Sequence, residues 1–380
     1  MYVHNARPII LMRVKKFVLK NMVLWFALVA AAVTCFFVPF DKEYIGYFDF
    51  GTLGCLFCTL LLVCAFRNIK IFEFLAGSIV KHIGNIRYAI LALVMITYAA
   101  SMVLANDMAL VTFLPLGYFV LKSCNQQKHM AFTFVMQNVA ANLGGMLTPF
   151  GNPQNLYLYS YYNIPTGEFF EIMSVPFAVA FVLIVATCFF VKKEKLTIAV
   201  PAPERPSVWR TAVYGVLFVV SVCTVFRLFP YYWGVLAVFV SVLILDPKAV
   251  LKVDYLLLLT FCAFFVFSGN MARIPVIQSL LSAVVGKSPL LVGTLSCQII
   301  SNVPSSVLLS HFTTDYRNLL VAVNIGGLGT PIASLASLIT LNSYRNFGDG
   351  KVGKYVGLFS LVNFSYLIVL VAVQLMLTYP

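Results

Sequence analysis

The sequence contains the same motif twice, and this duplication constrains the fold more than any other feature. Residues 142–149 have the sequence NLGGMLTP, and residues 324–331 have NIGGLGTP. A short polar interruption precedes each copy inside an apolar stretch, at 105–108 (ANDM) and at 301–304 (SNVP). Gly, Pro and Asn interrupt helices, and apolar helices broken at matching positions of a duplicated unit are typical of transporters. We therefore predict a membrane transporter whose site lies where the breaks meet.

The composition predicts that this unit lies in a lipid bilayer. Hydrophobic residues make up 61% and charged residues 10% of the 380 residues, whereas about 45–50% of residues are apolar in soluble domains. We therefore expect an all-α integral membrane protein, divided into spans of about 20 residues each. The expected spans are 22–39, 49–66, 130–163 with a break, 172–191, 211–229, 231–246, 253–268, 317–345 with a break, and 354–378.

Two further apolar segments do not fit an ordinary span. Segment 88–121 carries Asn106 and Asp107 in its middle, and segment 288–311 has the polar run 301–306 in its middle. Each arm of the second segment has about 12 residues and reaches only about 18 Å as a helix, which is too short to cross the hydrocarbon core. We predict two re-entrant helical hairpins whose tips stop near the midplane.

The basic residues predict the topology. With the N terminus in the cytoplasm, the positive-inside rule is satisfied, because the only Lys and Arg residues outside are Lys42, Arg227, Arg273, Lys287 and Arg317. The two hairpins then enter from opposite sides, so the repeats are inverted. The expected organisation is a first repeat at 1–191, which includes a retained N-terminal helix, a cytoplasmic linker at 192–210, and a second repeat at 211–380. We predict a multi-pass protein of the cell (plasma or inner) membrane.

The most specific polar run is the first break, TPFGNPQN at 148–155. Here Gly151 permits a strained turn, the prolines stop the helix, and the amides offer donors and acceptors. Helix N-termini at such breaks suit an anion and C-termini suit a cation. The alternative is an ordinary polar loop at the membrane surface. The candidate binding residues at the two breaks are Thr148, Gly151, Asn152, Gln154, Asn155, Thr330 and Ser334.

The hairpin tips supply the remaining candidates. Asp107 is an acid deep inside a hairpin, where ionisable residues are functional candidates by default. It could bind Na⁺ or carry a proton, and the alternative is a structural N-cap of the second hairpin helix. We expect Na⁺ near Asn106, Asp107 and Asn302. The other tip candidates, Ser301, Ser305 and Ser306, could instead bond freed backbone groups. Asp49 and Asp254 are interpreted as helix starts.

These residues resemble those of the ion transporter superfamily, which includes divalent anion/sodium symporters, citrate transporters, arsenite efflux permeases and some sodium/proton antiporters. The similar segments are 105–107, 144–155, 301–302 and 326–331. The resemblance implies substrate and Na⁺ sites at the tips and breaks, dimerisation through scaffold helices, and an elevator-like movement. Dicarboxylate symporters of this group tend to carry Ser-Asn-Thr at both tips, whereas this chain has Ala-Asn-Asp and Ser-Asn-Val.

The function predicted from the sequence is secondary active transport of a small anion, a carboxylate or an inorganic oxyanion, coupled to Na⁺ or H⁺. The alternatives are a Na⁺/H⁺ antiporter and an arsenite-type efflux permease. An enzyme is not expected, because no histidine lies in mid-membrane and no apolar run contains a pair of acids. No other cofactor and no nucleic-acid partner are expected, since the net charge of +13 reflects basic residues at the membrane border.

Overall fold

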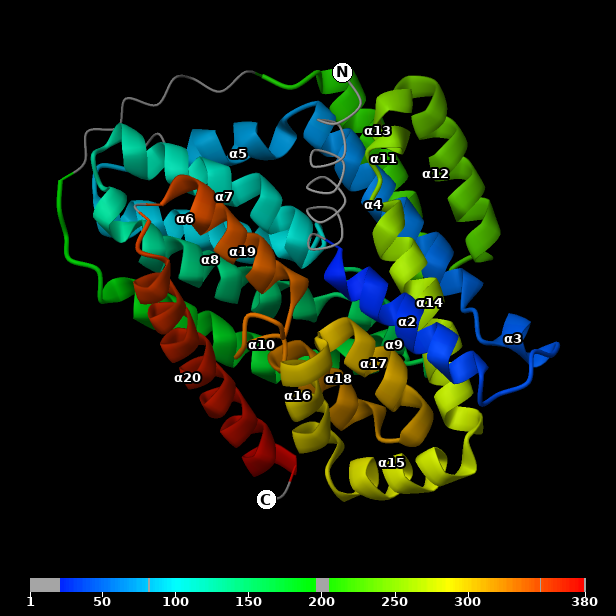
Figure 1. Ribbon diagram of the computed structural model, residues 1–380. Coiled ribbons are helices and arrows are strands. Elements are labelled where there is room, and N and C mark those ends of the chain that lie inside the picture. The colour runs from blue at the N-terminus through cyan, green and yellow to red at the C-terminus, as the bar shows by residue number, and fades with distance from the viewer. Residues whose placement is uncertain (1–20, 81–82, 196–204, 349, 379–380) are drawn as a thin grey trace, which may run out of the picture.

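The computed structural model describes residues 21–80, 83–195, 205–348 and 350–378. Every named element within those ranges is a helix, as expected for an all-α protein (Figure 1). The first repeat contains α2 (Met22–Cys35), α3 (Glu43–Gly46), α4 (Phe50–Asn68), α5 (Ile71–Val80), α6 (Ile86–Ser101), α7 (Asn106–Ser123), η1 (Gln127–His129), α8 (Met130–Gly144), η2 (Gly145–Leu147), α9 (Pro153–Tyr161) and α10 (Thr166–Phe189).

The second repeat contains α11 (Val208–Val225), α12 (Tyr231–Leu245), α13 (Pro247–Leu251), α14 (Tyr255–Arg273), α15 (Pro275–Lys287), α16 (Pro289–Ile300), α17 (Asn302–Leu309), η3 (Ser310–Phe312), α18 (Tyr316–Ile325), α19 (Leu335–Phe347) and α20 (Val352–Thr378). From α14 to α20, the second repeat follows the order of α4 to α10. The basic residues of the N-terminal stretch up to Lys20, and residues 196–204 of the expected linker, lie outside the described residues.

Several helices have the length and hydropathy of membrane spans. Within the described ranges, five are long and apolar enough to cross a bilayer alone: α4, α10, α11, α14 and α20. Shorter apolar helices, such as α6 and α12, accompany them. The chain is therefore a multi-pass membrane protein.

The expected breaks are present in both halves. The span expected at 130–163 is divided into α8 and α9, and the span expected at 317–345 is divided into α18 and α19. The hairpin segments form the helix pairs α6–α7 and α16–α17, each joined at its predicted polar tip. The duplicated unit thus forms two sets of corresponding helices, from α4 to α10 and from α14 to α20.

Several span boundaries differ from the sequence prediction: the span expected at 211–229 ends at Val225, and the span expected at 253–268 continues to Arg273. Two further differences have a clear physical reason. The first helix ends at Cys35 and not at residue 39, because Pro39 disfavours a helical conformation in the residue before it. The span expected at 172–191 begins at Thr166. Its first turn carries Glu168, which is held by Arg317 at 2.8 Å and so extends the helix beyond the apolar run.

Matched polar residues start corresponding helices in the two repeats. Asp49 caps α4 by accepting a hydrogen bond from the Thr52 backbone N–H at 2.9 Å. Asp254 caps α14 by accepting a hydrogen bond from the Leu257 backbone N–H at 3.0 Å. A side-chain oxygen that accepts from the first turn satisfies an N–H group with no partner in the helix. The interpretation of both acids as helix starts is confirmed.

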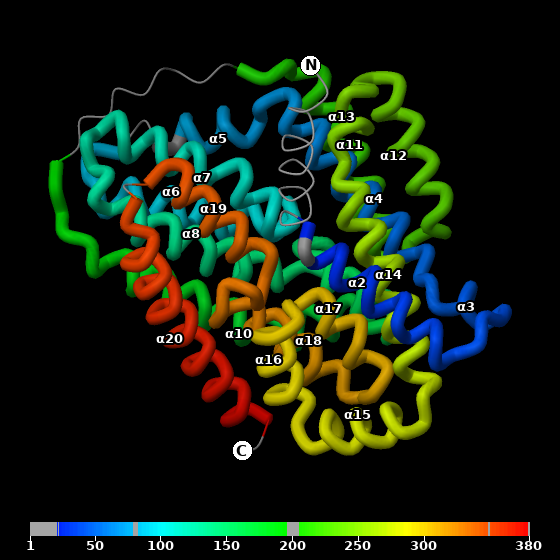
Figure 2. The backbone as a smooth tube through the Cα atoms, viewed as in Figure 1, coloured from blue at the N-terminus to red at the C-terminus, as the bar shows by residue number. Residues whose placement is uncertain are grey.

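The helices pack as two groups (Figures 1 and 2). The scaffold group consists of α2, α4, α11, α12 and α14, in which α2 packs on α14 and α12 packs on α4. Helices α2 and α12 therefore each pack against a helix of the other half. The hairpin group consists of α6 to α9 and α16 to α19. The two groups contact each other through α4 with α9 and α14 with α17.

Candidate functional site

Each broken helix holds the first helix of its own hairpin through the repeated motif. The Thr148 hydroxyl donates to the Met102 carbonyl at 2.6 Å, and the equivalent Thr330 donates to the Gln298 carbonyl at 3.2 Å. Both threonines were predicted as binding residues, and in the structure their hydroxyls join the break to the hairpin. The motif therefore fixes the position of each hairpin end.

Glycines allow this close packing. A Cβ atom on Gly144 would lie 2.2 Å from the Tyr98 carbonyl oxygen, and one on Gly151 would lie 2.2 Å from the Gly145 carbonyl oxygen. Such distances leave no room for any side chain. Gly151 was predicted to permit a strained turn, but it does not have a positive φ. It is required because two backbone segments meet at the first break.

The second tip has a strained backbone. Ser301 has φ 76° and ψ 157°, a region that residues other than glycine rarely adopt, at a cost of about 1–3 kcal/mol. Two hydrogen bonds to the Ala333 carbonyl hold it there, one from the Asn302 backbone at 2.9 Å and one from the Ser301 hydroxyl at 3.3 Å. The second tip is thus attached to the second break.

Buried asparagines join the two halves. The Asn152 amide donates to Asn324 Oδ1 at 2.9 Å, and Asn324 Nδ2 donates to Asn155 Oδ1 at 2.6 Å. At the first tip, the Asn106 amide donates to Asn142 Oδ1 at 3.4 Å. Asn142 and Asn324 were not among the predicted site residues, although each opens the repeated motif. Their repetition was the signal that could have identified them.

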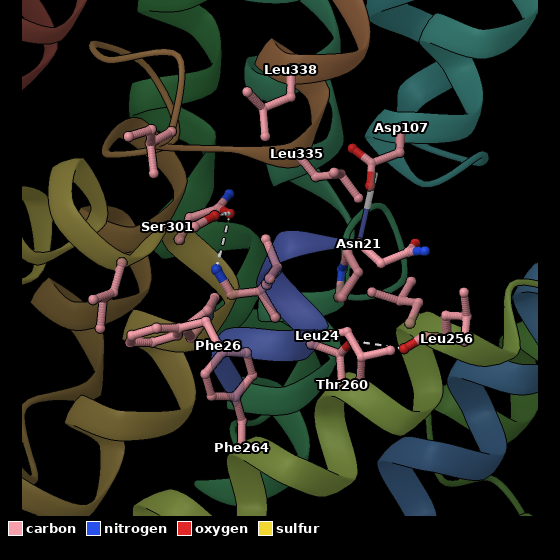
Figure 3. A pocket seen from close by; sticks show the side chains of 18 of the residues that line it. Asn21, Leu24, Phe26, Asp107, Leu256, Thr260, Phe264, Ser301, Leu335 and Leu338 are labelled. Atoms are coloured by element: carbon pink, nitrogen blue, oxygen red, sulfur yellow. Dashed lines mark hydrogen bonds between the residues drawn. The ribbon is translucent and has the colours of Figure 1, made fainter. Parts of the chain in front are cut away.

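Both hairpin tips line one cavity of about 390 Å³ (Figure 3). Four predicted residues contribute to its wall: Asn106 and Asp107 from the first tip, and Ser301 and Asn302 from the second. Apolar residues of α2, α14 and α19 complete the wall, among them Leu24, Phe264 and Leu335. The sequence motifs therefore converge on one cavity, in which few polar groups face an apolar surface.

Asp107 is the unsatisfied polar residue of this cavity. Its Oδ1 is buried and has no hydrogen-bond partner among the described residues. The residue that precedes α7 is Ala105, and the side chain that accepts from a first-turn backbone N–H is that of Asn106, whose Oδ1 lies 2.9 Å from the Asp107 nitrogen. The structure therefore does not use Asp107 as an N-cap. A buried carboxylate oxygen without a protein partner is able to accept a proton or coordinate a cation.

Asp254 brings a second carboxyl group to the same cavity. Sequence reasoning treated it only as a helix start, because nothing in the sequence places it near the tips. Among the described residues that line the cavity there is no Lys, Arg or His. The two acids of the described wall attract cations and repel an unaccompanied anion.

The other predicted residues lie behind this wall. Ser305 Oγ lies 2.8 Å from Ser296 Oγ, and the Ser306 hydroxyl donates to the Val303 carbonyl at 2.7 Å. Ser334 caps α19, as Asn152 caps α9. Gln154 is buried, and its Oε1 is without a partner in the described part of the chain. The bonds of the three serines and Asn152 hold the tips and breaks in place around the cavity.

Known proteins share both the sequence and the fold. Residues 9–315 match the family described as citrate transporter. An uncharacterized transporter of Methanocaldococcus jannaschii is 33% identical over 326 residues, covering 85% of this chain and 89% of that protein. The inner membrane protein YbiR of Escherichia coli is 30% identical over 316 residues, covering 80% of this chain and 83% of that protein.

A solved structure has the same fold. The crystal structure of the Alcanivorax borkumensis YdaH transporter aligns with a TM-score of 0.54 over 95% of this chain and 99% of that chain. The sequences are 14% identical.

Proposed function

The chain belongs to the citrate transporter family, and from this premise we propose that it is a secondary active transporter of small anions coupled to Na⁺ or H⁺. The observation that carries the proposal is the meeting of both hairpin tips at one cavity, where Asp107 Oδ1 has no partner among the described residues. The anion is a carboxylate or an inorganic oxyanion. In this proposal, the protein transports the anion and does not convert it chemically.

The charge of the cavity explains why a cation is required. Asp107 and Asp254 both face it, and an anion would be repelled unless a cation or proton neutralised at least one carboxylate. Binding of the cation first therefore makes binding of the anion favourable. This order of binding couples the two fluxes. We place the cation at Asp107, with the amides of Asn106 and Asn302 beside it.

The position of the tips indicates which side the cavity faces. The first tip lies beside the last turn of α4, where Arg67 Nη1 is 3.7 Å from Met108 Sδ. The same cavity includes Asp254, at the start of α14. Under the positive-inside topology, with the N terminus in the cytoplasm of a plasma or inner membrane, both ends are cytoplasmic. We therefore interpret this conformation as inward-facing.

Alternating access then requires the hairpin group to move relative to the scaffold group. Such a movement would carry the tips away from Asp254 and toward the opposite ends of α4 and α14. The family resemblance also implies that the scaffold forms a homodimer. Both features are part of the proposal.

A binding screen on detergent-purified protein tests the function. A ligand that binds only the folded state raises the melting temperature by mass action. We would follow melting with citrate, succinate, malate, phosphate, sulfate and arsenite, each with and without Na⁺ and at two pH values. Stabilisation by one anion only when Na⁺ is present, or only at the lower pH, would support the proposal.

A second function is supported by the two carboxyl groups and by the lack of a basic side chain in the described wall of the cavity. A Na⁺/H⁺ antiporter or an arsenite-type efflux permease needs no site for an organic anion. Stabilisation by Na⁺ or by pH alone, with no effect of any anion, would favour the antiporter. Stabilisation by arsenite alone would favour the efflux permease.

Cysteine accessibility tests the re-entrant hairpins. In the variants Asn106→Cys and Asn302→Cys, we expect both positions to react from the cytoplasmic side in the conformation described here. Conditions that favour the opposite state should move the reaction of both to the outer side. Labelling from one fixed side in every condition would contradict the alternating-access model.

A further inference from the structure

A second cavity lies at the opposite end of α4. It has a volume of about 640 Å³ and is bounded by the start of α4, the end of α9 and the corner between α11 and α12. Its polar wall includes Asp49, Thr52, Ser160, Asn163 and Arg227. None of these residues takes part in the cavity at the tips.

The second cavity is the repeat counterpart of the first. Four positions of α4 and its cap line it, namely Asp49, Gly51, Thr52 and Cys55. The residues 205 positions later in the sequence, Asp254, Leu256, Leu257 and Thr260, line the cavity at the tips. The same face of the duplicated helix therefore borders both spaces, and the inverted topology places them on opposite sides of the membrane.

Arg227 distinguishes the second cavity from the first. It is an exposed residue with φ 60°, directly after α11, and its guanidinium lies 4.3 Å from the centroid of the Tyr159 ring. Its Nη2 donates to the Tyr159 carbonyl. No hydrogen bond from its Nε or Nη1 is formed to any described residue, and no described carboxylate forms an ion pair with it. Donors of the guanidinium thus remain free at the cavity.

Asp49, the acid in this cavity, forms no ion pair with Arg227. Asp49 Oδ1 accepts from the Thr52 backbone at 2.9 Å, and Oδ2 accepts from the Thr52 hydroxyl at 2.6 Å. Both carboxylate oxygens are therefore engaged by the first turn of α4. A guanidinium with free donors binds carboxylate and inorganic oxyanions in a bidentate manner.

The corner that carries Arg227 is held rigidly. A Cβ atom on Gly234 of α12 would lie 1.9 Å from Thr224 Oγ1, and one on Gly54 of α4 would lie 2.9 Å from Val235 Cγ2. These close approaches fix α11, α12 and α4 together. Arg227 is thus presented by the scaffold group, whereas its contact residue Tyr159 belongs to α9 of the hairpin group.

We propose that the second cavity is an anion-binding vestibule in which Arg227 recognises a small oxyanion before it reaches the hairpin tips. This inference rests on the proposed function, and it adds a residue that selects for negative charge on the outer side.

Charged thiol reagents test the vestibule without knowledge of the substrate. In the full-length variant Ser160→Cys, the rate of modification at position 160 is measured by peptide mass spectrometry. Two methanethiosulfonate reagents are compared, one with a sulfonate and one with a trimethylammonium group. We expect Arg227→Gln to lower the ratio of the sulfonate rate to the trimethylammonium rate by about fivefold or more. Arg227→Lys, which keeps the charge, should preserve the ratio.

Arg273→Gln is the matched control. Arg273 lies on the same expected side but pairs with Asp41 and Glu43, and it does not line the cavity. An unchanged ratio in Arg227→Gln, or an equal fall in Arg273→Gln, would overturn the inference. Citrate or phosphate should slow modification when Arg227 is present and not in Arg227→Gln. Slowing in both proteins or in neither would also overturn it.

The two proposals can fail separately. The reagent ratio reports the electrostatic field in the vestibule and requires no transport. If the ratio of the two modification rates depends on Arg227 but no anion raises the melting temperature, the result would count against the transported anion only. An anion that stabilises the protein with Na⁺, together with a ratio independent of Arg227, would count against the vestibule only.

Discussion

The two repeats make the same structural bonds and differ where chemistry is expected. Thr148 and Thr330 join the break to the hairpin in each half, and Asp49 and Asp254 start corresponding helices. At the tips the halves diverge, since Asp107 in the first repeat corresponds to Val303 in the second. The duplicated residues therefore build the frame, whereas the unmatched residues are the candidates for ion coupling.

The largest effect is expected at the unmatched acid. Asp107→Asn keeps the shape of the side chain and removes its charge, so we expect coupled transport in proteoliposomes to fall at least about 100-fold. Val303→Ala, at the corresponding position, should retain most of the activity. Insertion and melting of both variants are checked first. Full activity with unchanged cation dependence in Asp107→Asn would remove this residue from the coupling role.

A smaller effect separates the two capping acids. Asparagine caps helices about as well as aspartate, so Asp254→Asn and Asp49→Asn should both preserve the helix starts. Only Asp254 faces the tip cavity with Asp107. We expect Asp254→Asn to weaken cation binding about tenfold, as measured by the Na⁺ or proton dependence of melting. Equal effects of the two substitutions would remove the distinction between them.

The frame itself can be tested at the glycines. A methyl group at Gly144 would meet the Tyr98 carbonyl oxygen at 2.2 Å, and one at Gly326 would meet the Ala322 carbonyl oxygen at 2.5 Å. We expect each alanine variant to lose about 1–3 kcal/mol of stability, with the larger loss at Gly144. Gly357→Ala is the control, since nothing lies within 4 Å of its Cβ position. Wild-type melting of Gly144→Ala would refute the close approach.

The smallest effect concerns the paired threonines. Replacing Thr148 or Thr330 by valine removes one hydrogen bond to a hairpin carbonyl and keeps the volume. We expect a loss of about 1 kcal/mol at each site in thermal unfolding. The loss should be larger at Thr148, whose bond is 2.6 Å against 3.2 Å at Thr330. A loss of transport without any change in melting would instead indicate contact with substrate.

Much of the fold could be predicted because the breaks are encoded locally. Gly, Pro and Asn at the tips and breaks stop helices wherever they occur, so both helix pairs and both broken spans were identified. Helix ends were less predictable. The apolar run after Cys35 continues to Phe40, although the helix does not. Hydropathy predicts which residues can lie in the bilayer, whereas backbone constraints, such as those imposed by proline, determine where a helix ends.

The site was predictable only in part, for a different reason. The four residues at the tips could be identified because a polar group in an apolar segment is conspicuous. Asp254 and Arg227 could not, because each lies at a helix end, where charged residues are ordinary. Their proximity to a cavity results from packing between the two halves, such as that of α2 on α14, and no local pattern encodes that packing.

The bonds made by Asn324 have a consequence for the direction of flux. Its side chain accepts from Asn152 and donates to Asn155, so the first break is tied directly to the second. Under the proposed mechanism, the tips and breaks would travel as one piece and present Asn106, Asp107 and Asn302 on both sides of the membrane. The protein would then favour neither uptake nor export. The gradients of anion and cation would alone determine which way the cargo moves, and reversing them would reverse the flow.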